Sequence, residues 1–321
     1  MKAVIEAIRR HKRFVVSSHI NPEGDALGSA LALAALLKRL GKRATVTTDG
    51  GIPETFKFFP RLAPVAGKFT PALKADVAIT VDVPVLERLG CMRKLFEQTP
   101  LTVNIDHHVS NQRFADINWV DPKAAAVGEM IYRLYRAFRI QPTREEALCL
   151  YVSIVTDTGS FKYMSTTPEV HRIASDLIAR GVSPLQVSQD LYECHQPKDL
   201  RFLGAVLRNL RILPDGKIAW LEIPHAQFKS FRPGPEIADE LVNYPRSVRT
   251  AEVAFVLKQE TNDGKIRISF RSKGRVDVNR IARQFGGGGH MAASGCTIEG
   301  TLPQARKKVL HAVRKAVASA R

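Results

Sequence analysis

Acidic and imidazole side chains recur in four separate segments of the sequence, each at or near the end of an apolar run. A single aspartate after a strand is most often a cap or turn residue, and a single histidine is most often a surface or core residue. Three adjacent ligand-type residues at 106–108 are a stronger signal, and the four segments together are stronger than any one of them. The segments contain His19, Glu23, Asp25, Asp82, Asp106, His107, His108 and Asp157.

Carboxylates and imidazoles without thiolates favour a divalent metal ion of intermediate hardness. Mn²⁺ fits this ligand set best, and Mg²⁺, Co²⁺, Fe²⁺ and Zn²⁺ are alternatives. The set holds more ligands than one ion needs, so we expect two ions about 3.5–4 Å apart that share a bridging carboxylate. A hydroxide held by two ions would attack phosphorus in line, while the ions neutralise charge on the phosphoryl group. The serines at 17, 18 and 29 lie in no recognisable Ser-His-Asp pattern.

Alternating strands and helices in the first half of the chain must position these side chains. Apolar runs rich in β-branched residues predict strands at 14–18, 44–48, 77–83 and 101–105. Helical periodicity predicts helices at 25–40, 124–138, 144–155 and 168–180. This alternation predicts an α/β domain with a mainly parallel sheet flanked by helices. Ligands of such sheets bind beyond the carboxyl ends of the strands, so we expect the four segments to meet there.

The pattern changes in the second half of the chain. It predicts a smaller, mixed α/β domain with strands at 218–223, 252–259, 265–271 and near 296–299, and helices at 277–284 and 303–320. A charged helical stretch precedes these elements. We therefore predict a metal-binding domain over 1–185, a helical linker over 186–215 and a substrate-binding domain over 216–321, across a cleft from the first.

The charge balance indicates a phosphate-rich partner. In a chain of 321 residues, 48 Lys and Arg face 31 Asp and Glu, which gives a formal net charge of +17. Such an excess attracts nucleic acid, nucleotides or other polyanions, although charge that only serves solubility would give the same number. Hydrophobic residues at 45% and charged residues at 25% are typical of a globular protein, and the length suggests two domains.

Four widely spaced cysteines without a CxxC pair predict neither a disulfide framework nor a zinc knuckle. We therefore expect a reducing, cytoplasmic setting. Residues 1–14 carry charges throughout and lack the apolar stretch of a signal peptide. The longest apolar run, 30–37, is too short to cross a bilayer, so we expect no membrane association.

Taken together, the motifs resemble those of the DHH phosphoesterase superfamily over nearly the whole chain. HINPEGDALGS, VDV, DHH and TDTG stand in the order of the family, and Gly286-Gly-Gly-Gly-His290 is similar to the glycine-rich motif of the DHH-associated domain. Length and domain order are most similar to the branch of bifunctional oligoribonucleases. The resemblance implies an enzyme that hydrolyses short oligoribonucleotides (nanoRNA) to mononucleotides, and also 3′-phosphoadenosine 5′-phosphate (pAp) to AMP.

The same resemblance implies how the metal ligands divide between two ions. His19, Glu23 and Asp82 would hold one ion, and Asp25, Asp82, His107 and Asp157 would hold the other. Asp82 would bridge them. At Glu23 the sequence departs from the family, which has aspartate there. Glutamate is still an oxygen ligand but is one methylene longer, which puts full occupancy of the first metal site in question.

Asp106 and His108, the two neighbours of His107 in the sequence, would also take part in catalysis. The resemblance implies that Asp106 orients the metal-bound imidazole of His107 from behind, which is a usual arrangement for such ligands. It also implies that His108 contacts the scissile phosphate. Catalysis would therefore depend on Asp82, Asp106, His107 and His108.

Four successive glycines allow backbone N–H groups to approach an anion closely, although a turn after a helix would show the same run. The resemblance implies that Gly287, Gly288, Gly289 and His290 bind a terminal phosphate or base of the substrate. Arg271 lies near this run, and arginine suits bidentate contacts to phosphate. We expect short single-stranded RNA or small nucleotides as partners. The sequence leaves open whether the chain forms a homodimer.

Alternative functions remain open from the sequence. Within enzymes, they are a phosphodiesterase for cyclic or linear dinucleotides and a RecJ-like single-strand exonuclease, whose relatives usually carry extra domains. A family II pyrophosphatase would lack the domain with the GGGGH run. Outside enzymes, the chain would be a nucleotide- or RNA-binding protein that has lost hydrolysis, and Glu23 is the feature that favours this interpretation.

Overall fold

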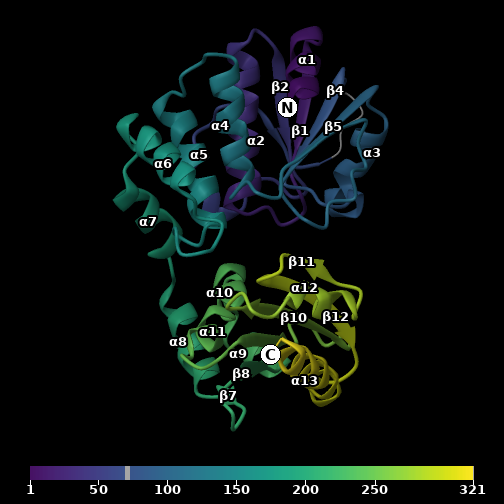
Figure 1. The fold of residues 1–321 in the computed structure, drawn as a ribbon, viewed down its shortest axis with the longest axis vertical. Helices are drawn as coiled ribbons and strands as arrows, with labels where there is room; N and C mark the ends of the chain where they lie inside the picture. The colour runs from purple at the N-terminus through teal and green to yellow at the C-terminus, as the bar shows by residue number, and fades with distance from the viewer. Residues whose placement is uncertain (69–72, 321) are drawn as a thin grey trace. The chain divides into compact units, whose positions relative to one another are not determined.

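The computed structural model describes residues 1–68 and 73–320, except the side chains of residues 235, 236 and 239. Contacts divide the chain into two units, Met1–Glu193 and Cys194–Arg321. Each unit is a sheet flanked by helices (Figure 1). The predicted fold class, a mainly parallel α/β domain followed by a smaller mixed one, is confirmed.

The sheet of the first unit is parallel throughout, in the order β3-β2-β1-β4-β5-β6. Buried β-branched residues fill its central strands, which is typical of a parallel sheet covered on both faces. Two of its strands, β3 and β6, are short or half-buried and were not predicted. The strands are β1 (Arg13–Ser17), β2 (Arg43–Thr47), β3 (Val65–Ala66), β4 (Val77–Val81), β5 (Leu101–Asp106) and β6 (Ile117–Val120).

Helices cover both faces of this sheet. On one face lie α2 (Gly24–Arg39), α4 (Val127–Ala137) and α5 (Arg144–Asp157), which share one hydrophobic core with Phe14 and Ile79 of the sheet. On the other face, α3 (Arg93–Glu97) and the short helix η2 (Leu86–Met92) pack against Val15 and Ala78. The remaining helices of the unit are α1 (Lys2–Arg10), η1 (Glu54–Phe56), α6 (Pro168–Ala179) and α7 (Pro184–Tyr192).

The helices α2 and α5 cross in close contact, and this contact needs small residues. A Cβ atom at Gly28 of α2 would lie 2.4 Å from the carbonyl oxygen of Cys149 in α5. Residues 24–37 of α2 are all buried, so this helix lies in the interior and not at the surface. The close crossing fixes the start of α2 relative to the end of α5, and both ends carry predicted metal ligands.

The second unit has a mixed sheet in the order β11-β12-β10-β9-β8-β7, in which only β8 and β9 pair in parallel among the described strands. The helices α12 (Val278–Arg283) and α13 (Leu302–Ser319) pack on one face, and α8 (Pro197–Leu207) and α10 (Pro235–Glu240) pack on the other. The strands are β7 (Arg211–Ile212), β8 (Ile218–Ile223), β9 (Val253–Lys258), β10 (Lys265–Ser272), β11 (Gly288–Gly289) and β12 (Ala293–Glu299); the other helices are α9 (His225–Phe231) and α11 (Asn243–Ser247).

The stretch predicted as a linker, 186–215, is shared between the two units. α7 ends at Tyr192 in the first unit, whereas α8 begins at Pro197 in the second. Phe202 and Val206 of α8 are fully buried in the core of the second unit. α8 is therefore a core helix, because its apolar face packs on the sheet. Within the described residues, no helix combines the length and apolar character that a membrane span requires.

Candidate metal centre

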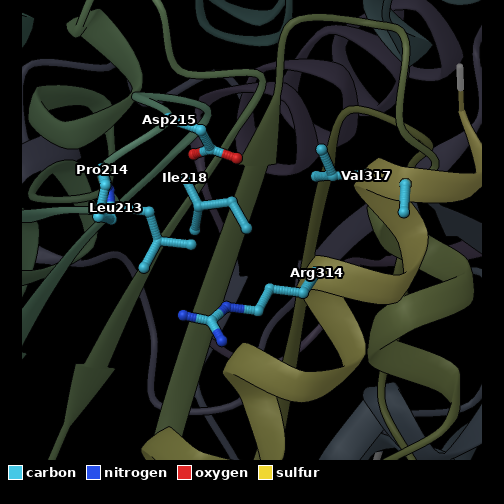
Figure 2. A pocket seen from close by; sticks show the side chains of 7 residues that line it. Leu213, Pro214, Asp215, Ile218, Arg314 and Val317 are labelled. Atoms are coloured by element: carbon cyan, nitrogen blue, oxygen red, sulfur yellow. The ribbon is translucent and has the colours of Figure 1, made fainter.

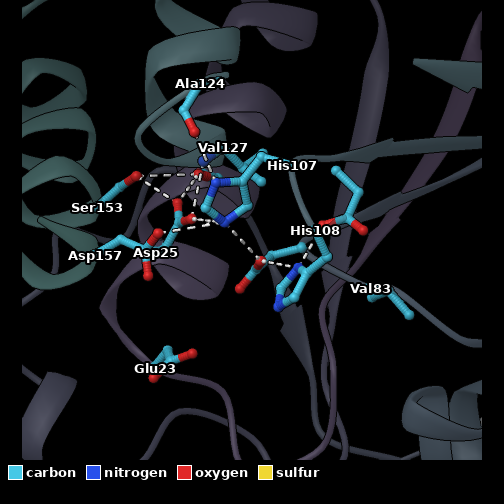
Figure 3. Close-up of polar contacts among 12 residues, drawn as sticks. Glu23, Asp25, Val83, His107, His108, Ala124, Val127, Ser153 and Asp157 are labelled. Atoms are coloured by element: carbon cyan, nitrogen blue, oxygen red, sulfur yellow. Dashed lines mark hydrogen bonds and ion pairs between the residues drawn. The ribbon is translucent and has the colours of Figure 1, made fainter. Parts of the chain in front are cut away.

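The predicted ligands gather at the carboxyl edge of the parallel sheet. Asp82 directly follows β4, and Asp106 is the last residue of β5. Asp25 lies in the first turn of α2, and Asp157 is the last residue of α5. Their ligand atoms form three overlapping groups, shown in part in Figure 3: His19, Glu23 and Asp82; Asp25, Asp82 and His107; and Asp82, Asp106 and His108.

Asp82 belongs to all three groups. Its Oδ2 lies 3.4 Å from Nε2 of His19, and its Oδ1 lies 3.7 Å from Nε2 of His107. Two ligand atoms that each lie about 2.0–2.2 Å from one ion are separated by about 3–3.5 Å, so these spacings leave room for an ion on each side. The backbone of Asp82 has φ 59°, which is strained for a residue with a side chain and recurs at functional sites.

On the first side, His19 presents Nε2 towards the carboxylates. Its Nδ1 lies 2.7 Å from the carbonyl oxygen of Ile20 and must donate to it, which leaves Nε2 to bind a metal. Nε2 of His19 and Oδ1 of Asp82 are buried and have no hydrogen-bond partner among the described residues. Buried polar atoms without partners are rare, so Nε2 of His19 fits a cation on this side, and Oδ1 of Asp82, which faces His107, fits a cation on the other.

Glu23 is the least constrained of the predicted ligands. Its side chain is 64% exposed, whereas that of His19 is 1% exposed, and its Oε1 lies 3.7 Å from Nε2 of His19. Figure 3 shows Glu23 apart from the contacts that join His107, Asp25 and Asp157. The longer side chain thus reaches the first group from the solvent side.

On the second side, His107 is held in a similar way. Its Nδ1 donates to the carbonyl oxygen of Ala124 at 3.0 Å. Its Nε2 faces Oδ2 of Asp157 at 3.3 Å and Oδ2 of Asp25 at 3.8 Å. The ring is therefore fixed by the backbone, and its other nitrogen is directed at carboxylates from α2 and α5 (Figure 3).

Asp25 also caps another helix. Val127 N donates to its Oδ2 at 2.8 Å, and Gly128 N donates to its Oδ1 at 3.2 Å, both from the first turn of α4. The hydroxyls of Ser29 and Ser153 donate to Oδ1 as well, at 2.9 Å and 2.6 Å. The N-cap residue of α4 is an alanine without a capping side chain, so Asp25 supplies the acceptor that this helix lacks.

Several carboxylates are buried close together at this site, and bound cations would neutralise their negative charge. Burial raises the pKa of Asp25 to about 6, with Asp82 adding to it, and burial raises the pKa of Asp157 well above its usual value. Burial alone would lower the pKa of His107, but the carboxylates of Asp157, Asp25 and Asp82 outweigh it and raise that pKa to about 10. Without metal, protons must offset the crowded negative charge. Two divalent ions would do so more fully, and the donor set fits them.

Asp106 contacts a different histidine from the predicted one. Its Oδ1 accepts from Nδ1 of His108 at 2.8 Å, while His107 is held by the Ala124 carbonyl. The reason is the alternation of an extended chain, in which residues two apart share a side and neighbours do not. The hydrogen bond from His108, opposing the effect of burial, brings the pKa of Asp106 down to about 2. The predicted orienting role for Asp106 therefore applies to His108.

Two asparagines that the sequence reasoning missed support this pair. Asn111 donates through Nδ2 to Oδ2 of Asp106 and, at 2.8 Å, to Oδ1 of Asn104. Asn104 is fully buried on β5 and donates to Thr80 Oγ1 at 2.8 Å. An asparagine inside an otherwise apolar strand was the available signal, since buried amides need partners.

In the second unit, the glycine run has a structural explanation at most of its positions. A Cβ atom at Gly287 would lie 2.1 Å from the carbonyl oxygen of Gly295, because β11 packs closely on β12. Gly286 and Gly289 have φ 73° and 139°. Only Gly288 among the four has an ordinary φ and open space at its Cβ position, with Oδ1 of Asn279 3.9 Å away. The predicted anion contacts of this run stay predictions.

The other predicted substrate contacts lie beside the same strands. Arg271 is half-buried on β10, opposite Ala293 of β12, and its Nη1 donates to the carbonyl oxygen of Phe270 at 3.0 Å. His290 forms the turn between β11 and β12, where its backbone N donates to the Ala293 carbonyl oxygen at 2.7 Å. Arg271 and His290 thus flank the end of the glycine run in one unit.

The second unit also contains a pocket of about 320 Å³ between the β7–β8 turn and α13 (Figure 2). Figure 2 shows Arg314 extending from α13 towards Leu213 and Ile218. The lining is mostly apolar, and its carboxylate, Asp215, already accepts from Lys217 N at 3.0 Å. The pocket holds no cluster of ligand-type side chains, so the candidate site is the metal centre of the first unit.

Comparison with known proteins agrees with the motifs. Residues 13–154 match the DHH family, N-terminal domain, and residues 226–319 match the DHHA1 domain. The bifunctional oligoribonuclease and PAP phosphatase NrnA of Thermus thermophilus is 32% identical over 310 residues, which cover 94% of this chain and 89% of that protein. The protein of the same name from Bacillus subtilis is 28% identical and covers 92% of both chains.

A solved structure shows the same fold. The exopolyphosphatase-related protein from Bacteroides fragilis superimposes with a TM-score of 0.89 at 28% identity, over 98% of this chain and 95% of that one. The resemblance inferred from the motifs is thereby confirmed. The chain belongs to the DHH family, with a DHH domain in its N-terminal half and a DHHA1 domain in its C-terminal half.

Proposed function

We propose that this chain is a two-metal phosphoesterase that hydrolyses short oligoribonucleotides to mononucleotides and pAp to AMP. The observation that carries the proposal is the position of Asp82, whose two oxygens face His19 and His107 within one buried cluster. The two NrnA relatives, which match nearly the full length of the chain and are named as oligoribonucleases and PAP phosphatases, support the choice of substrate.

The ligands would divide as the family resemblance implies. His19, Glu23 and Asp82 would hold the first ion, and Asp25, Asp82, His107 and Asp157 would hold the second. When bound, the two ions supply a metal-activated water nucleophile and neutralise the charge of the phosphoryl group. Mn²⁺ suits the mixture of imidazoles and carboxylates.

The buried pair of Asp106 and His108 would act on the substrate directly beside the ions. Asp106 accepts from Nδ1 of His108, so Nε2 is the ring nitrogen that we assign to the substrate, and it would donate to a phosphate oxygen or to the leaving oxygen when the ring is an imidazolium. Because Asp106 is fully buried and also accepts from Asn111, its carboxylate keeps one orientation. The pair thus fixes the orientation of the His108 ring before the substrate arrives.

The second unit would bind the rest of the substrate. Residues 194–321 contain 23 Lys and Arg but 11 Asp and Glu, so this unit carries +12 of the net charge of +17. A polyanionic substrate is attracted to such a unit. Arg271, Gly287, Gly288, Gly289 and His290 are the residues we assign to substrate contacts.

A direct assay tests the proposal. Purified protein is incubated with Mn²⁺ and, separately, an RNA dinucleotide, an RNA pentamer, pAp, cyclic di-AMP and pyrophosphate, each with a chelator control. We expect metal-dependent release of mononucleotides from the short RNAs and of AMP from pAp. Absence of turnover with Mn²⁺, Mg²⁺, Co²⁺ and Zn²⁺ would refute the proposal and favour a binding protein, whereas turnover of cyclic di-AMP alone would change the substrate class.

A further inference from the structure

Arg88 lies at the edge of the metal centre on a segment that is firmly attached to it. It belongs to η2, and its carbonyl oxygen accepts from the backbone N of Ile20 at 2.8 Å. Gly90, two residues on, has φ 56° and ψ −132°, and a Cβ there would lie 2.5 Å from Cγ2 of Ile20. The loop that carries His19 and the segment that carries Arg88 therefore hold each other in place.

The guanidinium of Arg88 lies against a ring nitrogen of His19 that cannot accept a hydrogen bond. Its Nη2 lies 3.2 Å from Nδ1 of His19. That nitrogen lies 2.7 Å from the Ile20 carbonyl oxygen and carries a proton directed at it. Two donors face each other, so this contact cannot be a hydrogen bond while His19 presents Nε2 to a metal.

Within the part of the chain that the structure describes, no carboxylate forms an ion pair with Arg88, although its side chain is half-buried; its charge acts on Glu23 from a longer range. An arginine that served only to support His19 would need an acceptor on the ring, which is absent. A half-buried guanidinium with unmatched donors, next to a centre suited to two cations, calls for an anion.

We propose that Arg88 binds the scissile phosphate of the substrate on the His19 side of the metal centre. This inference rests on the proposed function, because the anion is the phosphate of a nucleotide. The guanidinium touches the ring of a metal ligand, so a phosphate bound to the first ion is within reach of its planar donors. Arginine is suited to this because its fork can contact two phosphate oxygens at once.

The test compares Arg88→Ala and Arg88→Lys with a matched control, Arg93→Ala. Arg93 lies on the adjoining helix α3, is exposed and pairs with Glu97 at 2.7 Å, so it is a cation without a role at the site. Binding of AMP to the Mn²⁺-loaded proteins and binding of Mn²⁺ itself are measured by calorimetry. The kcat and KM for an RNA dinucleotide are measured in parallel, with and without added guanidinium.

We expect Arg88→Ala to weaken AMP binding by about 10- to 100-fold, the usual effect of losing a hydrogen-bonded charge contact. Affinity for Mn²⁺ should stay at the wild-type value, added guanidinium should restore part of the AMP binding, and Arg88→Lys should fall between. Arg93→Ala should match the wild type in every measurement.

Two results would overturn the inference. Unchanged AMP binding in Arg88→Ala would show that the guanidinium does not contact phosphate. Loss of Mn²⁺ affinity without rescue by guanidinium would show that Arg88 acts by positioning His19. Neither binding measurement needs turnover. A wild type that binds AMP through Arg88 but hydrolyses nothing would refute the proposed function and would leave Arg88 as a contact to a nucleotide phosphate.

Discussion

Asp106 accepts a hydrogen bond from Nδ1 of His108 at 2.8 Å, and both side chains are buried beside the candidate metal ligands. The pair resembles the carboxylate–histidine arrangements that fix a ring in one orientation and tautomer. In this chain the oriented ring is the one we assign to the substrate, whereas the metal-facing rings of His19 and His107 are oriented by backbone carbonyls.

The Asp106–His108 pair predicts a loss of turnover when the carboxylate becomes an amide. Asp106→Asn removes the negative charge and allows the ring to adopt the other tautomer. We expect kcat for an RNA dinucleotide to fall about 100-fold or more, while Mn²⁺ stoichiometry stays unchanged. The control is Asp116→Asn, whose carboxylate is exposed and accepts from Thr102 at 2.8 Å. Loss of bound Mn²⁺ in Asp106→Asn would contradict the assignment of Asp106 to His108.

The shared position of Asp82 predicts that one substitution affects both ions. Asp82→Ala should abolish turnover and reduce Mn²⁺ binding at both sites, because each oxygen serves a different ligand group. Glu23→Ala should weaken binding of the first ion alone, since its carboxylate forms its ion pair with His19, on that side of the site. Metal titration of the purified variants, followed by calorimetry, distinguishes the two patterns. Two Mn²⁺ ions retained at full affinity in Asp82→Ala would refute the bridging role.

The glycine run offers a pair of substitutions that separates folding from substrate binding. Gly287→Ala should destabilise the second unit by about 2 kcal/mol or more, because its Cβ would meet the Gly295 carbonyl at 2.1 Å. Gly288→Ala should fold normally, since its Cβ position is open. If the run holds a phosphate, Gly288→Ala should raise KM for the RNA dinucleotide at unchanged stability. Thermal unfolding and steady-state kinetics provide both readouts, and wild-type KM would remove Gly288 from the substrate contacts.

At the opposite edge of the first sheet, Asp76 predicts a dependence of stability on pH. It accepts from Nε of Arg13 at 2.9 Å, and this hydrogen bond lowers the pKa of Asp76 from 3.8 to about 2. A lowered pKa in the folded state adds stability above the unfolded value near 3.8, and this stability disappears as pH falls towards about 2. Asp76→Asn should therefore lower the free energy of unfolding by about 1 kcal/mol at pH 7. Urea denaturation at pH 7 and pH 3 checks this, and an equal loss at both values would argue against the ion pair.

Periodicity and the ends of apolar runs were sufficient to predict the central strands and the edge at which the ligands gather. The strands β1, β4 and β5 are short runs of mostly apolar and buried residues, so the positions of Asp82 and Asp106 at the ends of β4 and β5 could be predicted directly. Partners that depend on packing were not predictable. The bond from Ser153 to Asp25 joins residues 128 positions apart and exists because α2 and α5 cross closely at Gly28.

The error at Asp106 has a similar origin. Adjacency in sequence suggested His107 as its partner, but an extended chain directs neighbouring side chains to opposite sides. The short strand β6 was missed because its four residues are only half-buried and show no apolar pattern. In each case the outcome depended on the direction in which a side chain points. Sequence spacing predicts that direction only where the local backbone conformation is already known.

Asp25 contacts both a helix end and the predicted metal site, so its presence has two separate explanations. Its carboxylate completes the first turn of α4 through Val127 and Gly128, in addition to facing His107. A descendant that abandoned hydrolysis would be free to change His19 or Glu23, but replacing Asp25 would remove the acceptor of the Val127 amide at a buried helix end, whereas Gly128 N also donates to Ser153 at 2.9 Å. The presence of an aspartate at position 25 is therefore explained by the folding of α4 as well as by the predicted metal site.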